Sequence, residues 1–306
     1  MSTAELTFTS GGYRLAGGLT VPEGTGPFPA VLLVPGSGPV DRDSNHKRMP
    51  LDVTGALARA LAPAGFVTFA FDKRGTGASE GDWMSASLDE ATADARAALE
   101  LLRSRPEVDA SRVIVVGHSE GAIHATRLAA DGGLAGAVLL SASATPGEEL
   151  LAWQAANVAA SLPRLVKRLL ALLRQDLEAK TAKNREAIKA TSSPVARVGG
   201  QKVNAAWHRQ FMALDPRTEL AQVEVPVLAV TGAKDLQVKS SDLRVIARTV
   251  RGAVDAREIS DLTHILRRQL GEASLGAYKK ELRTPVDPRV VSAVVDWALE
   301  LASARV

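Results

Sequence analysis

The chain has 306 residues, 46% hydrophobic and 23% charged, a composition that is ordinary for a folded globular protein and excludes a disordered one. Its formal net charge is only +3, and because Lys and Arg are interspersed with Asp and Glu, no nucleic-acid partner is expected. The absence of cysteine excludes disulfides, thiolate metal ligands and a cysteine nucleophile.

Two features of the sequence concern location. Residues 1–18 contain no basic stretch followed by an apolar core, so no secretory signal is expected. The longest apolar runs, such as Ala135–Leu140, are too short to cross a bilayer. Together these observations predict a cytoplasmic protein that has no membrane partner.

In chain order, short apolar runs rich in β-forming residues alternate with longer helical patterns. The first two runs, Leu6–Thr9 and Arg14–Val21, flank Gly11-Gly12 and predict an antiparallel hairpin. Further strands are predicted at Ala30–Val34, Phe66–Phe71, Val113–Val116, Ala135–Leu140, Pro226–Thr231 and Ala256–Ile259. This alternation is typical of a mostly parallel sheet flanked by helices.

The helical patterns carry recognisable start signals. Ser87 has Glu90 three residues on, the spacing of a capping box, at the start of an amphipathic helix that ends near Arg103. The last helix opens at Asp287-Pro288, an N-cap followed by proline at the first helical position. Two other helices are predicted at Leu51–Pro63 and Glu120–Ala130.

Residues 144–223 interrupt the alternation, because they contain helical patterns but no strand signal. Helices are predicted at Leu150–Leu162 and Pro163–Lys183. Open α/β sheets bind ligands at the carboxyl ends of their strands, so a helical insertion here predicts a cap over that edge. The expected organisation is a core domain of residues 1–143 and 224–306, with residues 144–223 inserted as the cap.

The predicted helix Pro163–Lys183 is amphipathic and basic. One face carries Leu165, Leu169, Leu172 and Leu173, and the other carries Lys167, Arg168 and Arg174. We expect the apolar face to pack on the main domain while the charges face water. The alternative is a role at a membrane surface, which basic amphipathic helices can bind.

The pentapeptide Gly117-His118-Ser119-Glu120-Gly121 follows the β-branched strand Val113–Val116 and precedes a helix. This is the setting of a Gly-x-Ser-x-Gly nucleophile turn. The two glycines let the chain pass itself closely, and the positive end of the following helix favours a developing oxyanion. Ser119 is therefore the predicted nucleophile.

A serine nucleophile needs a base, and the base needs an orienting acid. Of the five histidines, only His264 lies beyond the last predicted strand; the others are His46, His118, His124 and His208. For the acid we favour Asp235, directly after the strand Pro226–Thr231, over Asp242 and Asp261. The predicted triad is Ser119, His264 and Asp235.

The oxyanion hole needs two backbone N–H groups, one from the residue after the nucleophile and one from the loop after the third strand. The first is Glu120. The second lies in Pro35-Gly36-Ser37-Gly38, where we favour Ser37 and keep Gly38 as the alternative. A phosphate-binding role for this loop is disfavoured, because no Gly-Lys-Ser/Thr and no Gly-x-Gly-x-x-Gly opens a helix.

These residues resemble the α/β-hydrolase superfamily over nearly the whole chain. Ser119, Asp235 and His264 follow its order, and Asp72–Ser79 resembles its Asp-x-Arg-Gly-x-Gly-x-Ser loop. The segment Pro35–Asp43, with the Gly-His-Ser-Glu-Gly turn, resembles bacterial carboxylesterases of the kind found in thermophiles, and dienelactone-hydrolase-like and acyl-peptidase-like proteins. The lipase sequence His-Gly-Gly-Gly is replaced here by Pro35-Gly36.

The resemblance implies the α/β-hydrolase fold and a serine carboxylesterase acting on small or short-acyl esters through an acyl-enzyme, with a small-molecule ester as its partner. No metal and no organic cofactor is expected, and both a monomer and a homodimer are compatible with the sequence. The alternatives are a thioesterase, a small-peptide or acyl-amino-acid hydrolase, and a non-catalytic ligand-binding member of the fold.

Charged residues alternate in two loops that the fold would bring together: Asp41, Arg42 and Asp43 in one, Asp72 and Arg74 in the other. Charge-assisted hydrogen bonds between them would fix the oxyanion loop. The alternative is that Arg42 or Arg74 recognises a substrate carboxylate.

Overall fold

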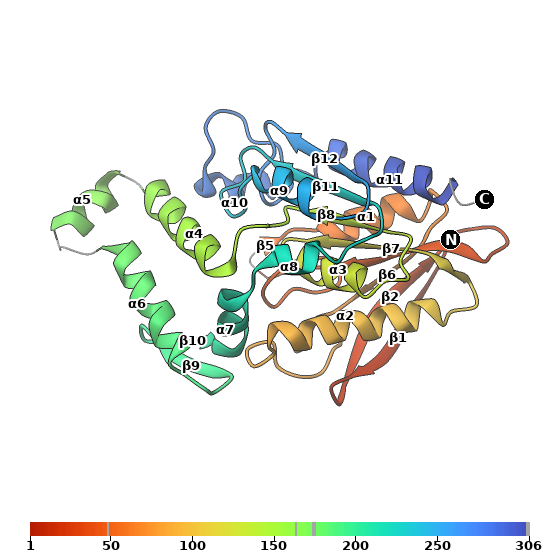
Figure 1. Cartoon of the computed structure of the whole chain (residues 1–306), viewed down its shortest axis with the longest axis horizontal. Helices are drawn as coiled ribbons and strands as arrows, with labels where there is room; N and C mark the ends of the chain where they lie inside the picture. The colour runs from red at the N-terminus through yellow and green to blue at the C-terminus, as the bar shows by residue number, and fades with distance from the viewer. Residues whose placement is uncertain (48, 163, 173–175, 304–306) are drawn as a thin grey trace.

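A computed structural model describes residues 1–47, 49–162, 164–172 and 176–303 of the chain. Its centre is an eight-stranded sheet in the order β1-β2-β6-β3-β7-β8-β11-β12 (Figure 1). Both pairings of β2 are antiparallel and the remaining pairings are parallel. The strands are β1 (Ser2–Ser10), β2 (Tyr13–Val21), β3 (Phe28–Val34), β6 (Val67–Phe71), β7 (Val108–His118), β8 (Gly136–Leu140), β11 (Val227–Gly232) and β12 (Val254–Ile259). The predicted fold, a mostly parallel sheet flanked by helices, is confirmed.

Helices cover both faces of the sheet, which explains why its central strands are apolar on both sides. In β3, Leu32 and Val34 pack in one cluster with residues of α2 and α3, whereas Val31 and Leu33 pack in another with residues of α1 and α11. The covering helices are α1 (Val53–Leu61), α2 (Leu88–Arg103), α3 (Glu120–Ala130), α9 (Asp242–Thr249) and α11 (Pro288–Ser303).

The turn between β1 and β2 and the start of α2 lie where the sequence predicts them. Gly11 and Gly12 both have positive φ, 54° and 82°, and form the turn between β1 and β2. Ser87 caps α2 in a complete capping box with Glu90. Smaller elements complete the core: β4 (Asn45–His46), β5 (Met49–Pro50), the 3-10 turn η1 (Leu275–Ala277) and α10 (Tyr278–Glu281).

The segment between β8 and β11 is mainly helical, but the prediction that it lacks strands is wrong. A hairpin is formed by β9 (Val195–Val198) and β10 (Gln201–Asn204), which are joined by Gly199-Gly200, both at positive φ. A glycine pair at a two-residue turn is a hairpin signal, and it was present in the sequence. The helices of the segment are α4 (Gly147–Ser161), α5 (Arg164–Leu172), α6 (Leu177–Lys189), α7 (Ala205–Ala213) and α8 (Pro216–Leu220).

The single helix predicted over 163–183 is also wrong. The chain forms two helices, α5 and α6. Asp176 is the N-cap of α6, and its carboxylate accepts hydrogen bonds from the N–H groups of Glu178 and Ala179. Pro163, Leu173 and Arg174 lie outside the described residues.

The apolar face of α5 does not pack on the main domain, contrary to our expectation. Leu165, Leu169 and Leu172 are 78%, 55% and 80% exposed. The reason is the position of the helix: α4 and α6 carry it to the end of an arm, away from the sheet (Figure 1). No helix within the described ranges is long and apolar enough to cross a membrane.

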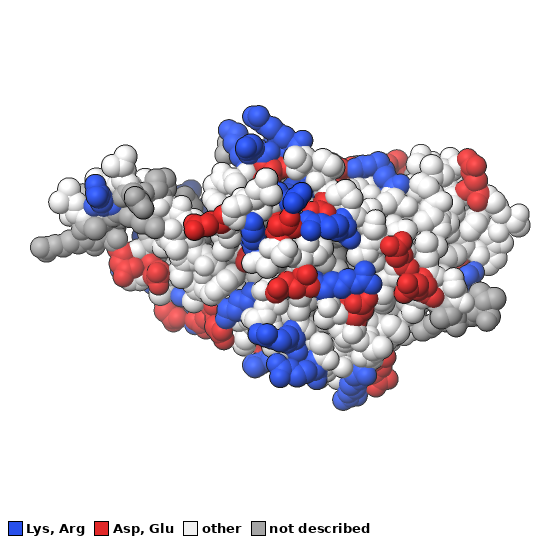
Figure 2. Space-filling model, turned by 90° about the horizontal axis from the view of Figure 1, so that it is seen from above, with Lys and Arg blue, Asp and Glu red and all other residues white. Residues whose placement is uncertain are grey.

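Figure 2 shows that Lys and Arg alternate with Asp and Glu over the visible face of the molecule. Neither sign of charge forms a continuous field there.

Candidate active site

Ser119 lies at the sharp turn between β7 and α3. Its backbone is in an unusual conformation for a side-chain-bearing residue, with φ 56° and ψ −118°. The turn requires glycine at both flanks, because a Cβ on Gly117 would collide with the backbone of Gly121, and a Cβ on Gly121 would collide with the carbonyl oxygen of Val34. The strain is therefore held in place by close backbone packing around the serine.

The three residues predicted as a triad meet at the carboxyl ends of the strands. His264 Nε2 lies 3.0 Å from Ser119 Oγ, and His264 Nδ1 lies 2.8 Å from Asp235 Oδ2. The other carboxylate oxygen of Asp235 accepts hydrogen bonds from the N–H groups of Gln237 and Val238, both at 2.8 Å. These bonds fix the carboxylate, so its free oxygen faces the imidazole.

The two rival acids are engaged elsewhere. Asp242 accepts hydrogen bonds from the backbone N–H groups of Ala144 and Thr145, at 2.9 and 3.0 Å, and so holds the loop after β8. Asp261 forms ion pairs with Arg268 and Arg289, both at 2.6 Å. Only Asp235, of these three carboxylates, contacts the His264 ring.

His118 supports His264 in a way that sequence reasoning did not foresee. Its Nε2–H donates to the backbone carbonyl of His264 at 2.9 Å, and the two rings lie 5.2 Å apart. Burial, assisted by the nearby His264, lowers the pKa of His118 to about 3. His118 is therefore a neutral hydrogen-bond donor, and its place beside the nucleophile in the motif was the only signal of this role.

The side chain of Glu120 is buried beneath the turn as one member of a charged network. Its Oε1 pairs with Lys73 Nζ at 2.6 Å and contacts His124 Nε2 at 3.3 Å. Burial opposes ionisation, but the Coulombic attraction of Lys73 and the hydrogen bond from His124 outweigh it and hold the pKa of Glu120 at about 2. His124 is itself buried and also contacts Thr92 Oγ1 at 2.9 Å.

The predicted oxyanion residues border a cavity. Ser37, Gly38 and Glu120 all line it. Within the described part of the chain, neither the N–H of Ser37 nor that of Glu120 donates a hydrogen bond.

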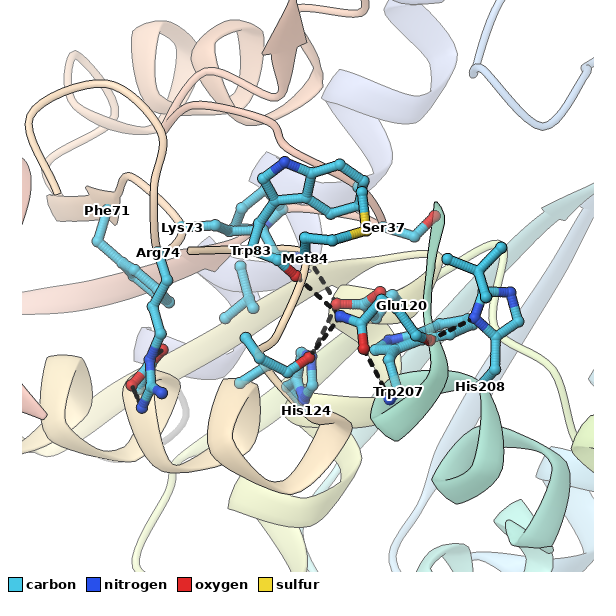
Figure 3. A pocket seen from close by; sticks show the side chains of 18 of the residues that line it. Ser37, Phe71, Lys73, Arg74, Trp83, Met84, Glu120, His124, Trp207 and His208 are labelled. Carbon is cyan, nitrogen blue, oxygen red and sulfur yellow. Dashed lines mark hydrogen bonds and ion pairs between the residues drawn. The ribbon is translucent and has the colours of Figure 1, made fainter. Parts of the chain in front are cut away.

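The cavity has a volume of about 340 Å³ and is mainly apolar (Figure 3). Neither Ser119 nor His264 lines it, so it extends from the Glu120 side of the nucleophile. The aromatic and sulfur-bearing side chains of its walls come from β6, the loop after it and α7: Phe71, Trp83, Met84 and Trp207.

Side-chain hydrogen bonds join the segment between β8 and β11 to the rest of the chain. Asn204, at the end of β10, donates to the carbonyl oxygens of Trp83 and Ala86, at 2.8 and 2.7 Å. On the other side, Gln154 and Asn157 of α4 donate to the carbonyl oxygens of Gln237 and Leu236. His208 lines the cavity from α7, where its Nδ1 bonds to the carbonyl of Asn204.

The two charged loops are joined by one strong pair. Arg42 forms two hydrogen bonds to Asp72, from Nε at 3.1 Å and from Nη2 at 2.8 Å. Arg74 instead turns to α2 and pairs with Asp94 and Glu90, each at 2.8 Å. Both guanidinium groups are neutralised within the protein, which disfavours the alternative that they recognise a substrate carboxylate.

His46 lies in β4, and no group of three or more acidic or histidine side chains among the described residues could hold a metal ion.

A mostly parallel sheet, a serine at a strand-to-helix turn, and Asp and His beyond later strands define an α/β-hydrolase. The profile of the serine aminopeptidase S33 family matches residues 51–266, and the chain belongs to this family.

A curated relative, Esterase EstD of Thermotoga maritima, is 28% identical over 294 residues, 94% of this chain. The chain spans 66% of the length of that relative. The likeness to carboxylesterases in the segment Pro35–Asp43 stays a prediction.

Two solved structures show the same fold at low sequence identity. Est1E from Butyrivibrio proteoclasticus, with ferulic acid bound, has a TM-score of 0.64 at 15% identity and covers 97% of this chain and 99% of its own. The esterase domain of a Rhodothermus marinus protein has a TM-score of 0.58 at 17% identity and covers 97% of this chain and 98% of its own.

Proposed function

We propose that this chain is a serine esterase that hydrolyses small or short-acyl carboxylic esters through Ser119, His264 and Asp235. The observation that carries the proposal is the unbroken hydrogen-bond chain from Ser119 Oγ to His264, 3.0 Å, and from His264 to Asp235, 2.8 Å. A base within hydrogen-bond reach of a hydroxyl, itself oriented by a buried acid, is what activates a serine.

In the proposed reaction, Ser119 Oγ attacks the ester carbonyl carbon while His264 Nε2 takes the hydroxyl proton. The tetrahedral intermediate collapses, the bond to the alkoxy oxygen breaks, and His264 gives its proton to that oxygen, so that an alcohol leaves. Water then attacks the acyl-enzyme with His264 again as base, releasing the carboxylic acid and restoring Ser119. Asp235 holds the imidazole in the required tautomer and stabilises its transient positive charge.

The negative oxygen of each intermediate would be bound by the N–H groups of Glu120 and Ser37, with Gly38 as the alternative second donor. Their lack of other acceptors within the described chain supports this role. Such donors act strongly because they are already oriented before the charge develops.

The cavity suggests a substrate with an apolar part of modest size. Its volume, about 340 Å³, lies at the small end of ligand pockets, and its aromatic walls favour an apolar acyl or alcohol group. EstD and the Rhodothermus marinus domain are named as esterases, and the structure of Est1E contains ferulic acid, a small carboxylic acid. We take residues 144–223 to be a cap over a core of residues 1–143 and 224–306.

The family name includes aminopeptidases, but the charges in the cavity favour an ester. A free α-ammonium group would need an available carboxylate. The acidic residues that line the cavity, Asp94 and Glu120, are bound to Arg74 and Lys73. A substrate cation would have to break one of these buried pairs.

The test is hydrolysis of p-nitrophenyl esters of graded acyl length, alongside matched thioesters and aminoacyl anilides. We expect ester turnover to exceed the other two and Ser119→Ala to lower it by at least about a thousandfold. Thioester or anilide turnover far above ester turnover would reassign the substrate. Full activity in Ser119→Ala, or failure of a fluorophosphonate to label Ser119 in the folded protein, would contradict the mechanism.

A further inference from the structure

Lys73 connects the two halves of the proposed oxyanion hole. It follows β6 in the loop Asp72–Ser79, and its ammonium group reaches across to two other elements. It donates to the carbonyl oxygen of Gly36 at 3.1 Å and pairs with the Glu120 carboxylate at 2.6 Å. The side chains of Lys73 and Glu120 are only 16% and 3% exposed, so solvent does little to screen this contact.

The first contact acts on the Ser37 donor through a shared peptide unit. The carbonyl of Gly36 and the N–H of Ser37 belong to the same planar amide, and in a trans amide they point in opposite directions. A cation on the carbonyl oxygen therefore fixes the plane in which the N–H points away from Lys73. It also polarises the amide, since hydrogen bonds in a chain strengthen one another.

The second contact acts on the Glu120 donor. Glu120 is the first residue of α3, so its N–H is one of the free donors at the helix start. Its carboxylate is anchored by Lys73 on one side and by His124 on the other, and His124 is held in turn by Thr92 of α2. The residue that carries the donor is thus tied both to the loop after β6 and to α2.

We propose that Lys73 is a positioning residue that holds the Ser37 and Glu120 N–H groups in register with each other. This inference rests on the proposed esterase function and adds a residue to it. Lys73 contacts the residues that carry the donors, not the reacting atoms. One ammonium group joins the loop after β3 to the first residue of α3, just beyond the last paired residues of β3 and β7, Val34 and Gly117.

The expected effect is on kcat, because the oxyanion is absent from the bound ester and develops only in the tetrahedral intermediates and the transition states that lead to them. Removal of an entire oxyanion donor costs about a hundred- to a thousandfold in kcat. Misplacement of two intact donors should cost less, so we expect Lys73→Met to lower kcat by about ten- to a hundredfold with KM changed less than threefold.

The experiment compares Lys73→Met, Lys73→Arg and Glu120→Gln with the wild-type protein. Arg can still donate to the Gly36 carbonyl, and Gln can still accept from Lys73, so both should retain more kcat than Lys73→Met. The control is Lys239→Met, which removes a largely exposed Lys–Glu pair with Glu149 that lies outside the site. Its kcat should stay within about twofold of wild type, because such pairs contribute little. Thermal unfolding of each variant reports whether it is folded.

A second readout is the affinity for a trifluoromethyl ketone, which adds to Ser119 and places an oxyanion in the hole. Its inhibition constant should rise in Lys73→Met in parallel with the loss of kcat. Unchanged kcat and inhibition constant in a folded Lys73→Met, or a raised KM with unchanged kcat, would overturn the inference.

If Lys73→Met does not fold, Lys73→Gln, which loses the charge but keeps a polar side chain, takes its place. A lowered kcat and a raised inhibition constant are expected, and wild-type values of both in the folded variant would overturn the inference. A wild-type protein without Ser119-dependent ester hydrolysis would instead refute the proposed function, so the two failures are distinguishable.

Discussion

At the scale of single residues, charge and hydrogen bonding decide which of several chemically similar groups can act. Asp235, Asp242 and Asp261 all follow late strands, yet each has a different set of partners. Asp235 has one oxygen committed to backbone N–H groups and one directed at His264. With one oxygen fixed by the backbone and the other bonded to the ring, Asp235 can orient the imidazole.

We predict that Asp235→Asn lowers kcat by about a thousand- to ten-thousandfold, because an amide in this place favours the wrong imidazole tautomer. KM should change little, since Asp235 does not line the cavity. Steady-state ester hydrolysis provides the measurement. The matched control is Asp261→Asn, which loses partly exposed ion pairs and should stay within about threefold of wild type. Equal losses in both variants would refute the assignment.

A second prediction concerns His118 and the pH dependence of stability. Its pKa falls from 6.5 to about 3 on folding, so between these values the unfolded chain binds a proton that the folded chain does not. The free energy of unfolding should therefore decrease as the pH falls from 6.5 toward 3. From pH 7 to pH 5 the loss should be about 1–2 kcal/mol.

Urea unfolding of wild type and His118→Asn at these two pH values measures that contribution. The variant has no group that titrates at position 118, so its stability should depend less on pH in this interval. Glu120 does not interfere, because its pKa falls from 4.5 to about 2 and its contribution is lost only below pH 4.5. An identical pH dependence in the two proteins would contradict the prediction.

At the scale of elements, helix ends organise both the core and the site. The capping box of α2 satisfies the N–H groups of Ser87 and Glu90, and the Glu90 carboxylate also pairs with Arg74 beside the cavity. The residue that helps to start α2 therefore also binds a residue that lines the cavity.

We predict that Ser87→Ala lowers the free energy of unfolding by about 1 kcal/mol, the usual cost of losing an N-cap. Ser104→Ala, at the other end of α2, removes only a hydrogen bond to the Leu101 carbonyl and should cost less. Urea denaturation of both variants makes the comparison. A larger loss in Ser104→Ala would show that the cap is not the stabilising feature.

At the scale of the whole molecule, the inserted segment shapes the cavity. Trp207 of α7 lines it, stacked on Phe211 with ring centroids 4.7 Å apart. The core contributes the proposed chemistry, and the insertion contributes one wall of the space beside it.

We predict that Trp207→Ala moves the preferred acyl chain toward longer esters, because loss of the indole enlarges the cavity. The measurement is kcat/KM over a series of p-nitrophenyl esters. Trp153→Ala is the control, since Trp153 lies on α4 in the same segment but does not line the cavity. A parallel loss on all esters, with no change in preference, would count against a role for α7 in acyl selection.

The sequence by itself determined the alternation of strands and helices, the turn at Ser119, and the order of Ser119, Asp235 and His264. These features depend on periodicity and turn chemistry over a few residues, which act before distant segments meet. The glycines at 117 and 121 are an example, because the turn can form only without their side chains. The β9–β10 hairpin carried such a local signal as well, in Gly199-Gly200, and was missed.

Only the tertiary structure decided which side chains face one another across the site. Lys73 reaches Gly36 and Glu120 across 37 and 47 residues of sequence, and His118 reaches the His264 carbonyl across 146. The exposure of α5 was likewise set by the course of α4 and α6 rather than by its own pattern. The amphipathicity and charge of a segment determine which kinds of group it can bury or bind. Which group it actually meets depends on how the sheet and helices pack around it.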